Sequence, residues 1–162
     1  MYKVVFDGDG LIKLAKSGLL DRATKSLKCI ISKEVYREVV EKGKEKLYED
    51  AYTVERFVHS GEIKVIEIRK IKSESSLGAG ELSTLEVYKN KKADIIVSDD
   101  RRFLRLLEEE NIPFIIPTDM IVILTKISKI TKEEAINSLN KIRNLVKEDA
   151  YLAALQNLGG EK

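Results

Sequence analysis

Acidic residues follow two short apolar segments at the points where strands should end. Asp7 and Asp9 come directly after the run 2–6, and Asp99 and Asp100 come directly after the run 94–97. Carboxylates held within a few ångströms repel one another, so such a group stays ionised only when cations compensate it. Hard oxygen ligands suit Mg²⁺ or Mn²⁺, and one cysteine and one histidine offer no cluster that would favour zinc. These four aspartates therefore predict a divalent-metal site.

Two glutamates on predicted helices extend this acidic group. Glu38 lies between Val35 and Val39 on the border of an apolar helix face, where an unpaired acid is costly. Glu81 lies in the first turn of a helix that opens near Gly78, a position that the helix dipole alone explains. Taken singly, a solvated stripe or a helix cap accounts for each acid. Taken together, acids at the helix starts and strand ends of one sheet edge favour a site.

The elements that must position these acids alternate between strand and helix. Apolar runs at 2–6, 29–31, 63–68, 94–97 and 113–116 predict strands, and periodic apolar residues between them predict helices. This alternation predicts a three-layer α/β/α sandwich around a parallel sheet of four to five strands. Ligands of such sheets bind beyond the carboxyl ends of the strands, where the aspartates lie. Two more helices should finish the chain, the last opening at Thr131 and continuing to Val146.

Length and composition limit the classes of function. The 162 residues suit one domain over 1–162, with 118–162 as its C-terminal helical part. The 29 basic and 27 acidic residues give a net charge of +2, too balanced to indicate a nucleic-acid partner. No apolar run reaches the ~20 residues that cross a bilayer, and the opening segment does not resemble a secretory signal. We therefore expect a cytoplasmic protein without a membrane partner.

Several surface features are also predicted from local composition. The polar segment 70–76 should form a mobile loop beside the site. Leu19 and Leu20, if exposed, or the apolar face of the last helix would support a homodimer. The single Cys29 is expected to be a buried small hydrophobic residue.

The segment Val4-Val5-Phe6-Asp7-Gly8-Asp9-Gly10-Leu11 resembles the first motif of haloacid dehalogenase-type phosphatases. In that reading Asp7 is a phosphorylated nucleophile and Asp9 an acid/base. The phosphatases usually have Thr or Val where this chain has Leu11, and their lysine lies well upstream of the last acidic motif, unlike Lys91 and Lys92. The resemblance ends after one motif, and the phosphatase stays open as an alternative.

Residues 1–117 as a whole resemble a PIN domain, the fold of VapC-type toxin ribonucleases and related archaeal nucleases. Asp7-Gly8-Asp9-Gly10-Leu11-Ile12 stands where that family has Asp-Thr-Asn/Ser-x-Leu-Ile, with Gly8 in place of Thr or Ser. Ser32 to Val39 resembles a segment ending in Glu-Val, and Gly80-Glu81 resembles an archaeal Gly-Glu-x-x-x-Leu form. Ser98 to Phe103 resembles Thr-x-Asp-x-x-Phe. The motifs match Asp7, Glu38, Glu81 and Asp100 to the family's metal ligands, with Asp99 as a neighbour or substitute.

The resemblance implies the strand order 3-2-1-4-5 and a Mg²⁺- or Mn²⁺-dependent nuclease that hydrolyses single-stranded RNA. Asp9 and Ser98 would support the site, and Arg101 and Arg102 would contact substrate phosphates. Four further basic residues could bind the RNA backbone as a track, although a plain charged strand edge is the simpler account of them. They are Lys64, Arg69, Lys70 and Lys72. Three roles stay open: a toxin paired with an antitoxin protein, a housekeeping nuclease, and a PIN protein that binds nucleic acid without cutting it.

Overall fold

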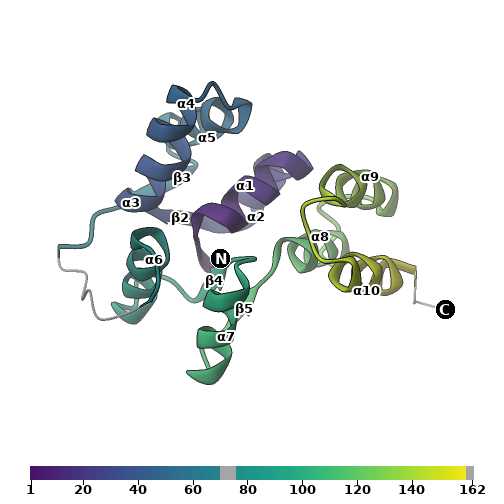
Figure 1. The fold of residues 1–162 in the computed structure, drawn as a ribbon. Coiled ribbons are helices and arrows are strands. Elements are labelled where there is room, and N and C mark those ends of the chain that lie inside the picture. The colour runs from purple at the N-terminus through teal and green to yellow at the C-terminus, as the bar shows by residue number, and fades with distance from the viewer. Residues whose placement is uncertain (70–75, 160–162) are drawn as a thin grey trace.

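Five parallel strands form one sheet in a computed structural model that describes residues 1–69 and 76–159. Their order is β3-β2-β1-β4-β5, so the first strand lies in the centre (Figure 1). The strands are β1 (Lys3–Phe6), β2 (Lys28–Ser32), β3 (Ile63–Ile66), β4 (Ile95–Val97) and β5 (Phe114–Ile115). The predicted fold class and strand order are confirmed, and the five strands lie where apolar runs predict them.

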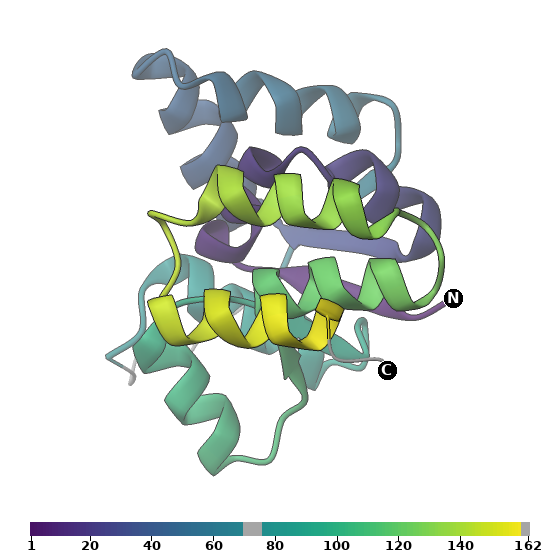
Figure 2. The same ribbon diagram turned by 90° about the vertical axis from the view of Figure 1, so that its right-hand side faces the viewer.

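Helices cover both faces of the sheet and make three layers, because alternate strand residues point to opposite faces. Val4 and Phe6 belong to one apolar cluster and Val5 to the other, and all three are fully buried. The larger cluster packs against α1 (Gly8–Ser17), α5 (Glu49–His59), α8 (Pro117–Lys126), α9 (Lys132–Ile142) and α10 (Glu148–Gly159). The smaller cluster packs against α6 (Ala79–Lys89) and α7 (Arg101–Glu109). Figures 1 and 2 show the helices on the two sides of the sheet.

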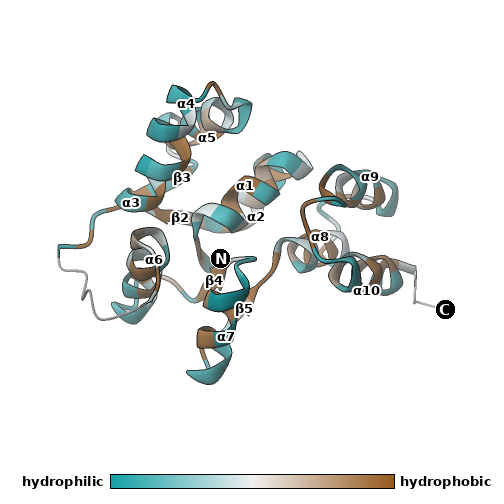
Figure 3. Cartoon of the chain, in the orientation of Figure 1, coloured by the Kyte–Doolittle hydropathy of each residue, from teal (hydrophilic) through white to brown (hydrophobic). Residues whose placement is uncertain are grey.

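Four short segments complete the chain between these elements. They are α2 (Leu20–Ser26), α3 (Lys33–Tyr36), the π-helix η1 (Arg37–Glu41) and α4 (Lys42–Glu45). In Figure 3 the strands are mainly hydrophobic, and hydrophilic residues lie on the outward sides of the helices. None of the helices in the described ranges combines the length and apolar character needed to span a bilayer.

Two predictions about local structure are wrong. Three helices, not two, follow β5, because the helix that opens at Thr131 ends at Ile142 and a new one begins at Glu148. Leu19 and Leu20 are 5% and 2% exposed, because the unpredicted α2 turns both side chains into the core; they therefore offer no dimer surface. The predicted loop at 70–76 lies outside the described residues except for Ser76. Cys29 is buried as expected.

Helices start at the carboxyl edge of the sheet, and three of the residues at this edge cap them. Asp7, Ser32 and Asp100 are the N-caps of α1, α3 and α7, and each side chain accepts a hydrogen bond from a backbone N–H of the first turn. The backbone N–H of Asp7 also donates to the Val97 carbonyl, at 3.1 Å, which ties the start of α1 to the end of β4. The edge at which ligands of parallel sheets bind is therefore built from capping side chains.

Gly10 lets α1 approach β4 closely enough to set this edge. A Cβ atom at position 10 would lie 2.6 Å from the Val97 carbonyl oxygen, a backbone atom that cannot move aside cheaply. We expect Gly10→Ala to lower the free energy of unfolding by about 1–3 kcal/mol, the usual cost of overpacking, in urea denaturation. Gly159→Ala is the matched control, because nothing lies within 4 Å of its added Cβ. Equal stability of the two variants would show that the close approach is unimportant.

Candidate active site

Asp7 lies at the end of the central strand and is only 2% exposed. Its Oδ1 accepts a hydrogen bond of 2.8 Å from the Gly10 backbone N–H, and its Oδ2 accepts one from the Ser98 hydroxyl. Burial raises the pKa of Asp7 to about 7, with smaller upward contributions from Asp9 and Glu81; the two hydrogen bonds lower it only in part. Neutral donors alone therefore do not compensate the Asp7 carboxylate.

Ser98 connects Asp7 to Asp100 across two adjacent strands. The Ser98 hydroxyl is fully buried and donates to Asp7, while its oxygen accepts the Asp100 backbone N–H at 3.1 Å. Asp100 Oδ1 in turn accepts the Phe103 backbone N–H at 2.9 Å, which leaves Oδ2 without a capping role. The predicted supporting residue Ser98 thus holds the two aspartates in a fixed relation.

Glu38 and Glu81 face each other from η1 and the first turn of α6. Partial burial and then the charge of Glu81 raise the pKa of Glu38, while Lys42 and the Gly80 backbone N–H lower it. A Cβ at Gly80 would lie 2.8 Å from Glu38 Oε2, and one at Gly8 would lie 3.4 Å from the same oxygen. The Glu38 carboxylate therefore occupies the space between two glycines that begin different helices.

A buried hydroxyl pair holds α6 in place beside α3. Ser32 Oγ and Ser83 Oγ are 2.6 Å apart, and Ser83 also donates to the Gly80 carbonyl at 2.9 Å. Ser32 is also the N-cap of α3, so one side chain fixes both helix starts. Ser83 was not among the residues predicted from the sequence, because its partner lies 51 positions away.

Lys13 forms ion pairs with two of the predicted acids and with none of the others. Its Nζ lies 2.6 Å from Asp99 Oδ2 and 3.1 Å from Asp9 Oδ2, so both aspartates share one cation from the chain itself. Sequence reasoning missed Lys13, although its spacing of four residues from Asp9 is that of a helical ion pair. Lys13 therefore offsets part of the charge of Asp9 and Asp99, while burial holds the pKa of Asp99 above its usual value.

The remaining four acids have no such partner in the part of the chain that the structure describes. None of its ion pairs there includes Asp7, Glu38, Glu81 or Asp100. No three Asp, Glu, His or Cys side chains in that part lie close enough together to hold a metal ion as they stand. In donor type and in uncompensated charge, however, these carboxylates fit a hard divalent cation.

The predicted basic residues lie at different places. Arg101 and Arg102 are exposed in the first turn of α7, next to Asp100. Lys64 is near the start of the edge strand β3, at the end of the sheet opposite the acids, which favours the plain charged strand edge. Arg69 is exposed after β3, and Lys70 and Lys72 lie outside the described residues.

A comparison with protein families matches residues 3–160 to one model, DUF3368, described as a PIN domain. The chain belongs to the PIN domain family. The comparison with curated proteins found no match, and neither did the comparison with solved structures. The match extends beyond residue 117 through the three C-terminal helices, so the resemblance seen in the motifs holds for nearly the whole chain.

Membership of the PIN family indicates the general class of activity to which the acidic edge belongs. PIN domains are in general metal-dependent nucleases that bind nucleic acid. A phosphatase of the haloacid dehalogenase type rests on one motif around Asp7, whereas the PIN match accounts for residues 3–160. In this PIN domain the switch point of the sheet lies between β1 and β4, and Asp7 and Asp100 follow those two strands.

The raised pKa of Asp7 predicts how stability depends on pH in metal-free protein. Because this pKa, about 7 in the fold, exceeds the unfolded value near 4, the folded protein holds a proton that the unfolded chain has released. The free energy of unfolding therefore falls as pH rises from about 4 to 7. Asp7→Asn removes this cost and keeps its oxygen for the Gly10 N–H, but its amide nitrogen cannot accept the Ser98 hydroxyl. It should therefore be more stable than wild type at pH 8 by up to about 3 kcal/mol, since a lost hydrogen bond of ~1 kcal/mol offsets part of the gain.

Urea denaturation in a chelator at pH 4 and pH 8 measures this difference. The gap between Asp7→Asn and wild type should widen toward pH 8, while the gap for Asp21→Asn, at a half-exposed position, should stay nearly constant. A variant at position 7 that is less stable than wild type at pH 8 would mean that the carboxylate contributes to stability without a cation.

Proposed function

We propose that this PIN domain is a divalent-metal-dependent endoribonuclease that hydrolyses phosphodiester bonds of single-stranded RNA. The observation that supports it most is the buried Asp7 carboxylate, which has neutral hydrogen-bond donors but no ion pair among the described residues. Glu38, Glu81 and Asp100 supply the other oxygen donors. Mg²⁺ or Mn²⁺ suits this all-carboxylate set.

Each residue has a separate task in this proposal. Asp7 and Asp100 bind the cation from one sheet edge, held in a fixed relation by Ser98. Glu38 and Glu81 bind from the facing helices. When bound, a divalent cation of this kind activates water for attack on phosphorus and stabilises charge on the phosphate. Lys13 holds Asp99 and Asp9 away from that role, so Asp99 supports the site instead of acting as a principal ligand.

The arginines at the start of α7 attract the RNA backbone. Arg101 and Arg102 are exposed and take part in no ion pair among the described residues. Guanidinium groups bind phosphate oxygens through paired hydrogen bonds, and both groups follow Asp100 directly. They therefore hold the phosphate next to the carboxylates.

Replacing the proposed ligands one at a time tests the nuclease. Asp7→Asn and Asp100→Asn keep their helix caps, because Asn caps helices as well as Asp does; Glu38→Gln and Glu81→Gln keep the side-chain shape. Each change should lower the rate of Mn²⁺-dependent cleavage of single-stranded RNA by about 100-fold or more. Gel assays measure the rate, and circular dichroism checks the fold.

Two control variants test whether a loss of cleavage is specific to the proposed ligands and is not caused by the removal of any acidic side chain. Asp99→Asn, which loses a carboxylate already paired with Lys13, should cost less than about 10-fold, and Asp21→Asn should cost nothing measurable. Normal cleavage by Asp7→Asn and Asp100→Asn would refute the proposal. Hydrolysis of a small phosphomonoester that depends on Asp7 but not on Glu38 or Glu81 would support the phosphatase instead, and inertness with every divalent metal would support a PIN protein that binds without cutting.

The resemblance to VapC-type toxins extends the proposal to partners. A protein of this kind would act inside the cell with an antitoxin protein, or as a homodimer. Both stay predictions. Size-exclusion chromatography with light scattering measures the dimer, and co-purification from the native host identifies the antitoxin.

A further inference from the structure

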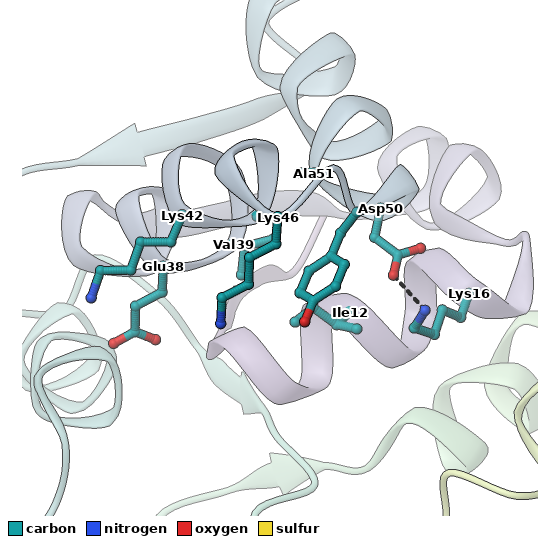
Figure 4. Close-up of a pocket in the computed structure, with 10 residues that line it drawn as sticks. Ile12, Lys16, Glu38, Val39, Lys42, Lys46, Asp50 and Ala51 are labelled. Carbon is teal, nitrogen blue, oxygen red and sulfur yellow. Dashed lines mark ion pairs between the residues drawn. The ribbon is translucent and has the colours of Figure 1, made fainter.

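A second hollow begins at Glu38 and leads away from the acidic edge. It has a volume of about 290 Å³ and lies between α1 and the segment from η1 to the start of α5 (Figure 4). Ile12, Val39 and Ala51 give it an apolar lining. Its volume is at the lower limit of typical ligand pockets, ~300–1,000 Å³, so one planar ring system fits and a duplex does not.

Hydrogen bonding and close packing around this pocket fix the backbone of an aromatic residue, Tyr48. Gly43 and Ala51 bring α4 and α5 together, since a Cβ at Gly43 would lie 2.8 Å from the Ala51 Cβ. The Tyr48 N–H donates to the Gly43 carbonyl at 2.9 Å. Tyr48 lines the pocket and yet is 56% exposed, so its ring is accessible to a ligand.

The π-helix η1 connects the pocket to the proposed catalytic edge. Within it, Glu38 is exposed and belongs to the acidic group, while the next residue, Val39, is 4% exposed and lines the pocket. π-Helical turns are often found at functional sites. A ligand in the pocket therefore lies one residue away from a proposed metal ligand.

Three lysines and two acids line the pocket, Lys16, Lys42 and Lys46 against Glu38 and Asp50, which leaves one excess positive charge. Lys16 is neutralised by Asp50, whose Oδ2 lies 2.6 Å from its Nζ, and this pair closes the end opposite Glu38 (Figure 4). Lys42 and Lys46 extend along the same side, and neither takes part in an ion pair within the described ranges. Lys46 Nζ lies 5.8 Å from the centre of the Tyr48 ring.

We propose that this pocket binds the base of the RNA nucleotide next to the phosphate that is cleaved, an inference that rests on the proposed function. The base stacks on Tyr48 and on the apolar lining, and Lys42 and Lys46 hold the phosphate that follows it. An aromatic ring beside basic side chains is the combination that proteins use to bind single-stranded nucleic acid.

A tryptophan reporter tests the base contact without any cleavage. The chain contains no Trp, so Tyr48→Trp introduces one fluorophore, whose emission a stacked base quenches. Tyr52→Trp is the matched control: Tyr52 is 43% exposed and has Lys44 Nζ 5.7 Å from its ring, but it lies outside the pocket. A single-stranded RNA hexamer, titrated in EDTA, should quench the reporter at position 48 and leave that at position 52 unchanged.

Affinity measurements in the same buffer distinguish the contribution of base stacking to RNA binding from the contribution of charge. Tyr48→Ala should weaken hexamer binding by about 5- to 100-fold, the usual contribution of base stacking, whereas Tyr48→Phe should bind normally. Lys46→Ala should weaken binding and reduce the slope of log K against log salt by about 0.7. Lys44→Ala, which loses the Glu55 pair and the contact with the Tyr52 ring outside the pocket, should not.

The two proposals fail in different ways. Quenching at position 48 in a protein that no metal makes active would support the base pocket and refute the nuclease. RNA cleavage at the acidic edge without quenching at position 48 would refute the base pocket alone. Quenching by an abasic hexamer as strong as that by the normal hexamer would also refute it, since no base is then required.

Discussion

The site depends on one constraint: a carboxylate that is buried at the end of the central strand without a cation from the chain. Asp7 must be there because its side chain caps α1 and accepts the Ser98 hydroxyl. The same interactions stop it from turning toward solvent, so its charge is not relieved by hydration and its pKa rises to about 7. The residue that caps α1 is thereby also a carboxyl group whose charged form is disfavoured by its surroundings.

The other acids at the edge form two groups, which differ in the positive charge that lies beside them. On one side Lys13 lies between Asp9 and Asp99, and its one positive charge offsets part of the charge of the two carboxylates. On the other side Glu38 and Glu81 repel each other, with a helix N-terminus and Lys42 as partial relief. No ion pair among the described residues includes Asp7 or either glutamate, so this second part carries the less compensated charge.

Local patterns were enough to predict most of the fold but only part of the site. Asp7, Ser32 and Asp100 are recognisable because a strand, a cap and a helix follow one another within a few residues. Whether Glu38 and Glu81 meet depends on the Ser32–Ser83 pair, 51 residues apart, which no local pattern reveals. The short α2 and the break after Ile142 were missed because each interrupts or replaces a helical period too briefly to stand out.

Gly8 is the position at which this chain lacks the hydroxyl-bearing residue of the PIN motif, and its surroundings in the structure involve Glu38. In the PIN motif that this chain resembles, position 8 carries Thr or Ser, so the sequence alone indicates a missing hydroxyl. In the structure a Cβ at position 8 would already touch Glu38 Oε2, at 3.4 Å, and a longer side chain would extend into the carboxylate. Gly80 limits the other side of the same group, at 2.8 Å. The Glu38 carboxylate therefore lies within contact distance of both glycines and borders the position at which the PIN motif carries a hydroxyl.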